Sequence, residues 1–190
     1  MNPLFDAVPI PAGWQGVTAR DQAEADRLIP ELLAAAGVRR FVRVELGAGP
    51  IELNFGDSEG LPTDLEPFRE RADLIGLVVA AGECGPAARP CHPAWLRSLR
   101  DQCDAAGVPF AFAGWGEWQP GNDHGKQDDD LRVLYLDGRL CEVAGDAYLD
   151  VAMSRELRPS PDAGGHLVSR VGSELSGRTL DGRTHDDDAE

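Results

Sequence analysis

Two glutamates lie where parallel sheets most often carry chemistry, directly after a strand. Glu45 ends a predicted strand, and Glu83 follows the apolar run Leu74–Ala80. The carboxyl ends of parallel strands meet at one edge of a sheet, so we expect both side chains to point into one cleft. Paired carboxylates there can do acid–base work, bind an amine or hold a cation. The alternative is that both are solvated loop acids, as is common in an acidic chain.

The loop from Gly82 to Pro93 carries further candidates for the same cleft. Arg89 either lines the cleft or forms an ion pair with Glu83. His92 either lines it or caps the helix that begins at Pro93. We expect no metal site, because the spacing of the cysteines fits no zinc or iron–sulfur pattern. The four cysteines are Cys84, Cys91, Cys103 and Cys141.

A third candidate is the motif Trp115-Gly116-Glu117-Trp118, which follows another predicted strand. Two tryptophans beside a glutamate can line a pocket or stack on a base or a sugar. More often such residues cover the end of a hydrophobic core. The sequence leaves both interpretations open.

Alternating strands and helices over residues 14–118 must position these residues. Short strands are predicted at 16–18, 41–45, 74–80 and 110–112, and a short helix at 65–71. One longer helix has an apolar face over 25–36, with Thr18 or Asp21 as its cap, a kink at Pro30 and Gly37 at its end. The other begins at Pro93 and ends at Gly107. This order predicts parallel βα units covered by helices.

Residues 119–190 change in character. Two strand-like runs, 131–136 and 139–143, flank Asp137-Gly138, which is a strong hairpin signal. Residues 119–130 and 158–166 are predicted to be exposed loops, and the last five residues an acidic tail. We therefore expect an N-terminal arm (1–13), an α/β unit (14–118) and a hairpin-bearing extension (119–190).

The overall charge excludes some function classes. The formal net charge is −15, which repels nucleic-acid phosphates and anionic membranes. No apolar run approaches the length of a membrane span, and the first residues do not resemble a signal peptide. We therefore expect a cytoplasmic protein with free thiols that binds neither nucleic acid nor membrane.

Several stretches resemble, in the same order, an uncharacterised family of phage and prophage proteins, the radical-SAM-like "gene product 37/68" group. The strongest runs are His92-Pro93 with Trp95, residues 97–103, residues 105–110 and the motif at 115–118. Other matching stretches are 16–18 with Gln22 and 25–30, 40–42 with Glu45 and 49–53, 82–83 with 85–86 and 88–90, and 170–172 with 177–178 and 180–183. The resemblance implies part of a (β/α) barrel, with about four parallel strands and outer helices, followed by a small β-hairpin extension.

The same resemblance implies that an N-terminal half bearing a three-cysteine cluster motif is missing. A radical-SAM reaction needs a [4Fe–4S] cluster on three thiolates, and none of the four cysteines replaces that motif. We expect no cofactor for this chain alone. S-adenosylmethionine and the cluster become relevant only if a partner supplies the missing half.

Three functional hypotheses follow. The favoured one is a non-catalytic remnant or protein-interaction module. Its open sheet edge is covered by the chain's own residues 1–13 and C-terminal region, by a second copy or by another protein. The second is one subunit of a split radical-SAM enzyme, in which Glu45, Glu83 and Arg89 line the ligand cleft. The third is an acidic decoy that binds a host protein, although the negative charge is spread along the chain.

Overall fold

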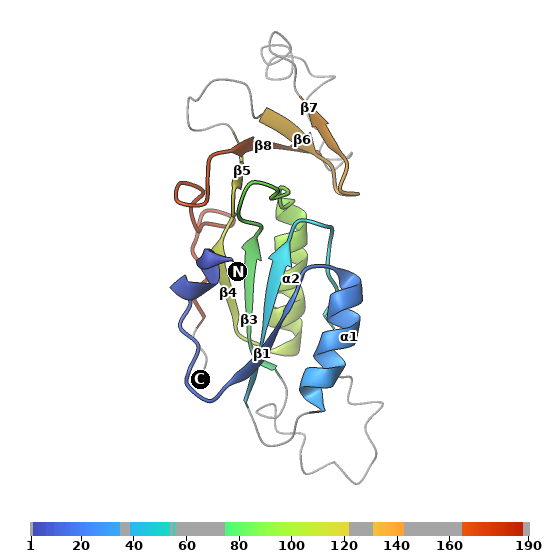
Figure 1. Ribbon diagram of the computed structural model, residues 1–190, viewed down its shortest axis with the longest axis vertical. Helices are drawn as coiled ribbons and strands as arrows, with labels where there is room; N and C mark the ends of the chain where they lie inside the picture. Colours follow the sequence, from blue (N-terminus) through green and yellow to red (C-terminus); the bar gives the residue numbers. More distant parts are fainter. Residues whose placement is uncertain are drawn as a thin grey trace.

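The computed structural model of the protein describes residues 2–34, 39–53, 55, 75–121, 131–142 and 165–187. These residues form two sheets (Figure 1). One is a parallel sheet of four strands in the order β1-β2-β3-β4, and the other is an antiparallel sheet in the order β5-β8-β6-β7. Figure 1 shows the antiparallel sheet beyond the carboxyl ends of the parallel strands.

The parallel sheet confirms the predicted α/β class. Its elements are β1 (Gln15–Ala19), α1 (Gln22–Leu33), β2 (Arg40–Leu46), β3 (Ile75–Gly82), α2 (Pro93–Ala106) and β4 (Phe110–Gly114). Both helices cover one face, where Val42, Val78 and Phe110 lie side by side in register. The strands form an open sheet, so the structure shows no closed barrel.

The helices begin at the residues that the sequence indicates. The Asp21 side chain accepts a hydrogen bond from the Glu24 N–H (2.8 Å), and α1 then continues through Pro30. α1 ends at Leu33 with Ala34 as its C-cap, so it is shorter than the predicted helix. Gly37 itself lies outside the described residues. His92 caps α2, and Gly107 ends it with a φ of +66°, a left-handed conformation that glycine adopts without strain.

The other face of the sheet is covered by the chain's own N-terminal arm. Residues 3–7 form the 3₁₀ helix η1 (Pro3–Ala7), which places Phe5 and, just after it, Val8 in a buried cluster. The sheet side of this cluster includes the small residues Ala81, Ala111 and Ala113. Because these side chains are short, the arm can approach the backbone of β3 and β4 closely.

The C-terminal extension is more than the predicted hairpin. The hairpin exists, with β6 (Leu131–Leu134) antiparallel to β7 (Leu140–Glu142). Two further strands, β5 (Trp118–Pro120) and β8 (His166–Arg170), complete the sheet. The predicted loops at 119–130 and 158–166 were wrong where they overlap β5 and β8. Both strands are short and form by pairing with each other across the sequence, which local patterns do not reveal.

The final described segment returns to the parallel sheet. Asp186 bridges to Ala111, the Phe112 N–H donates to the His185 carbonyl (2.8 Å), and the Phe110 N–H donates to the Asp187 carboxylate (3.1 Å). The outer edge of β4 is therefore covered. The predicted helix at 65–71 lies outside the described residues. No helix in the described ranges has both the length and the apolar character that crossing a bilayer requires.

The packing of the arm generates a stability prediction. Phe5 is 3% exposed, and its truncation would open a cavity against β3 and β4. We expect Phe5→Ala to lower the free energy of unfolding by about 3–5 kcal/mol, measured by urea denaturation. Asp6→Ala, at an exposed position of the same helix, should change it by less than about 0.5 kcal/mol. Equal effects of the two substitutions would contradict the proposed role of the arm.

Candidate functional site

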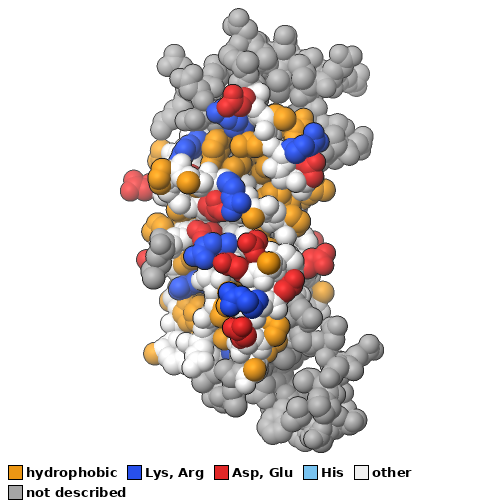
Figure 2. All heavy atoms as spheres, turned by 45° about the vertical axis from the view of Figure 1, so that its right-hand side comes forward, with side chains coloured by type: hydrophobic (Ala, Val, Ile, Leu, Met, Phe, Trp, Pro, Cys, Tyr) orange, Lys and Arg blue, Asp and Glu red, His pale blue; other side chains and the backbone are white. Residues whose placement is uncertain are grey.

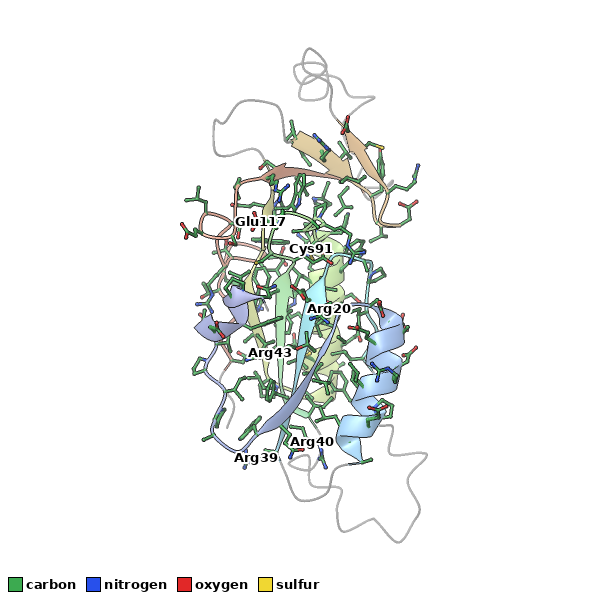
Figure 3. All side chains as sticks on the ribbon, in the orientation of Figure 1. Arg20, Arg39, Arg40, Arg43, Cys91 and Glu117 are labelled. Atoms are coloured by element: carbon green, nitrogen blue, oxygen red, sulfur yellow. The ribbon has the colours of Figure 1, made fainter. Side chains whose placement is uncertain are left out.

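The candidate site lies at the carboxyl ends of the parallel strands. Glu45 is near the end of β2, Glu83 directly follows β3 and Glu117 follows β4. The backbone brings two of these segments together, because the Glu117 N–H donates to the Glu83 carbonyl (2.9 Å). Figure 3 places Glu117 and Arg20 toward this end of the sheet. The Glu83 and Glu117 backbones are therefore neighbours at this end of the sheet.

Glu45 is held by the N-terminal arm and by β1. It is 9% exposed. Its Oε1 accepts a hydrogen bond from Asn2 Nδ2 (2.8 Å), and its Oε2 accepts one from Arg20 Nε (3.1 Å). Asn2 Nδ2 also donates to the Gly82 carbonyl at 2.8 Å. The Glu45 carboxylate therefore links the arm to Arg20 after β1, and Asn2 links the arm to the end of β3.

Glu83 forms an ion pair with Arg89. Its carboxylate accepts hydrogen bonds from the Arg89 backbone N–H (2.8 Å) and from the guanidinium Nη2 (2.5 Å). The pairing raises the pKa of Arg89. The Glu83 side chain is 13% exposed and that of Arg89 is 54% exposed. A Cβ at Gly47 would lie 2.4 Å from Glu83 Cδ, so Gly47 makes room for this carboxylate. The pair closes the loop after β3.

Glu117 connects both sheets. Its Oε1 accepts a hydrogen bond from the Gly85 N–H (3.0 Å), and its Oε2 lies 4.0 Å from Arg170 Nε on β8. Its backbone carbonyl accepts hydrogen bonds from the N–H groups of Val171 and Gly172 (3.0 and 3.1 Å). This residue fixes the loop after β3 and the end of β8 to the end of β4.

The two tryptophans and His92 are buried and hydrogen-bonded within the fold. The Trp115 indole donates to the Thr179 carbonyl (3.0 Å), and the Trp118 indole donates to the Ala88 carbonyl (2.8 Å). Both rings are buried in the core cluster, as the second interpretation of the motif held. His92 is also buried, and its Nδ1 accepts the Ala94 N–H (3.1 Å) at the start of α2. These three side chains cover and cap core elements.

Cys84 lies among the strand-end carboxylates. Its Sγ donates to Asn2 Oδ1 at 3.1 Å. Burial raises the pKa of this thiol, and the neighbouring Glu117 and Glu45 raise it further. The thiol is therefore held in its protonated form, which is a poor nucleophile. Within the described ranges, no group of three His, Cys, Asp or Glu side chains is placed to hold a metal ion.

Sequence reasoning missed two members of this network, Asn2 and Arg20. Arg20 follows β1 as Glu45 ends β2, so the strand-end rule could have found it. Asn2 gave no local signal, because its partners Glu45 and Gly82 are 43 and 80 residues away in the chain. Taken together, the strand-end side chains brace the arm, the loop after β3 and the second sheet.

A family described as "Protein of unknown function (DUF5131)" matches residues 2–188. The chain therefore belongs to this family. No curated protein and no solved structure matches it.

The Glu83–Arg89 pair gives a testable coupling energy. Arg89 is more than half exposed, so solvent screens the pair. We expect Glu83→Gln and Arg89→Ala each to destabilise the protein modestly, with a coupling of about 1 kcal/mol in the double-mutant cycle, measured by urea denaturation. Purely additive effects would contradict the pairing.

The raised pKa of Cys84 predicts its alkylation behaviour. A raised pKa means less thiolate at a given pH. The pH–rate profile for alkylation of Cys84 by iodoacetamide should therefore lie at higher pH than that of an unperturbed cysteine. Glu117→Gln removes a neighbouring negative charge and should shift the profile back toward lower pH. Mass spectrometry of the labelled peptides measures the alkylation rate of Cys84 in the unmodified chain and in the variant. Glu31→Gln, an exposed position on α1, is the matched control and should leave the profile unchanged.

Proposed function

We propose that the chain is a protein-interaction module that extends its parallel sheet onto another polypeptide at the outer edge of β1. The strand-end carboxylates support this because they are engaged by the chain's own groups. Glu45 is bonded to Asn2 and Arg20, and Glu83 is paired with Arg89. An unpaired strand edge, in contrast, offers backbone donors and acceptors to a partner.

The unpaired edge of β1 is the observation that carries the proposal. The Gln15 N–H donates to the Arg39 carbonyl (2.9 Å), so Gln15, Val17 and Ala19 direct their backbone groups toward β2. Gly16 and Thr18 therefore direct their backbone N–H and C=O groups away from β2, toward the outer edge of the sheet. No strand in the described ranges pairs on that side. The opposite edge, β4, is covered by residues 185–187.

A second copy of the chain is the partner that we propose first. Two β1 edges related by a two-fold axis can pair antiparallel, and each then satisfies the other's outward backbone groups. The net charge of −15 on each chain opposes this association. Added salt screens that repulsion, so the association should tighten as the ionic strength rises.

The second candidate is a subunit of a split radical-SAM enzyme, in which a partner completes a (β/α) barrel. The parallel order of the four strands and the unpaired β1 favour it, because further parallel strands would attach there. The described residues do not fit the cluster itself. Cys91 and Cys103 are buried in the core and Cys141 is exposed on β7, so the thiolates do not converge. A partner would have to supply all three cluster ligands.

The acidic-decoy alternative gains no support from the visible surface. On the face shown in Figure 2, acidic and basic side chains alternate and form no continuous acidic stripe. A decoy that imitates nucleic-acid phosphates needs such a stripe.

Association through β1 predicts a concentration-dependent mass. Light scattering should show the 20.4 kDa chain shifting toward twice that mass as its concentration rises. Thr18→Pro removes an outward N–H donor while leaving the bonds of β1 to β2, so this variant should stay monomeric.

Thr18→Val keeps the backbone donor and should associate like the unmodified chain. Circular dichroism checks that both variants fold. A monomeric unmodified chain at all concentrations and salt levels would contradict association with a second copy.

A further inference from the structure

Arg43 lies on the face of the sheet that the N-terminal arm covers. Along β2, Phe41, Arg43 and Glu45 alternate with the buried residues of the helix-covered face. The guanidinium carbon of Arg43 lies 5.3 Å from the ring centroid of Phe5 and 5.3 Å from that of Phe41. Two aromatic rings thus hold the guanidinium plane in place. Figure 3 shows Arg43 part-way along the sheet, between Arg20 and Arg39.

Other arginines of β2 and its surroundings have acceptors. Arg40 Nε donates to the Leu32 carbonyl (2.9 Å), and Arg20 Nε donates to Glu45 (3.1 Å). Arg43 Nε is buried and makes no hydrogen bond, and no carboxylate of the described residues lies within 4.0 Å of its guanidinium. Glu45, two residues further along the same face, is already bonded to Asn2 and Arg20.

Burying a guanidinium nitrogen without an acceptor is unfavourable, and it is rare in native structures. Arg43 as a whole residue is only partly buried, whereas its Nε atom is buried. Thr18 lies opposite Arg43 in the register of β1 and β2 and is also partly exposed. Its hydroxyl adds a second donor on the same face. The arrangement offers positive charge and hydrogen-bond donors, and no carboxylate of the described residues pairs with the Arg43 guanidinium.

We propose that Arg43 anchors an anion-binding site on this face of the sheet, which takes the carboxylate or phosphate group of a small ligand. The planar guanidinium can donate two parallel hydrogen bonds to either group. Its orientation is set in advance by Phe5 and Phe41. Because the net charge of −15 repels anions generally, binding depends on this local site. The proposal is independent of association through β1.

Thermal melts with inorganic phosphate, acetate or sodium chloride at matched ionic strength test the site. Phosphate or acetate should raise the melting temperature beyond the chloride control, and the more effective anion identifies the preferred group. Arg43→Met should abolish this difference, weakening apparent anion affinity by about tenfold or more. Without added anion, Arg43→Met should be at least as stable as the unmodified chain, because it removes the buried nitrogen that lacks an acceptor.

Arg39→Met is the matched control. Arg39 is exposed and stacks on Trp14, with its guanidinium carbon 5.7 Å from the ring. Arg39→Met removes one positive charge, and the rise in melting temperature with phosphate or acetate should remain. The Nε–H resonance of Arg43, assigned by its absence from Arg43→Met or Arg43→Lys, gives a readout that does not depend on stability. This resonance should shift with phosphate or acetate and not with chloride.

Equal responses to all three salts would overturn the proposal. An unchanged anion response in Arg43→Met, or an Nε–H resonance that ignores phosphate and acetate, would also overturn it.

Discussion

Strand β3 is buried on both faces, and this constraint organises the rest of the molecule. Leu77 and Val79 point to one side and Val78 and Ala80 to the other, and all four are fully buried. A strand of this kind needs a layer on each face. Helices α1 and α2 cover one face, as in ordinary βα units. The other face is covered by the N-terminal arm, which is why Phe5 and Val8 cluster with residues of β3 and β4 from Leu77 to Ala113.

The arm in turn determines what the strand-end carboxylates do. Asn2 must bond both Glu45 and the end of β3 to hold η1 against the sheet. Glu83 and Glu117 hold the loop after β3, and Glu117 connects that loop to β8. The backbones at this end approach closely. A Cβ at Gly82 would lie 1.9 Å from the Trp115 carbonyl oxygen, and one at Gly116 would lie 2.1 Å from that of Glu83. The polar residues that the sequence predicts to line a cleft instead join three segments of the fold.

The same arrangement leaves two features for which the described part of the chain provides no partner. The outer edge of β1 has no strand beside it in the described ranges, while β4 is covered by the C-terminal segment. The guanidinium carbon of Arg43 lies 5.3 Å from the ring centroids of Phe5 and Phe41, and its buried Nε makes no hydrogen bond. Both lie on the β1–β2 side of the sheet. The strand-end carboxylates are hydrogen-bonded within the described part of the chain, whereas the β1 edge and Arg43 Nε are not. Both proposals therefore concern binding.

The sequence by itself determined the parallel sheet, its two helices and the β6–β7 hairpin. Each depends on local signals: the apolar run of β3, the cap at Asp21, the glycine after α2 and the Asp137-Gly138 turn. Because the carboxyl ends of parallel strands meet at one edge of a sheet, the sequence also indicates that Glu45, Glu83 and Glu117 lie at the same edge. Only the tertiary structure decided that Asn2 would bond Glu45, that β8 would lie between β5 and β6, and that residues 185–187 would cover β4. These contacts join residues far apart in the chain, and their energy comes from surfaces that exist only after folding.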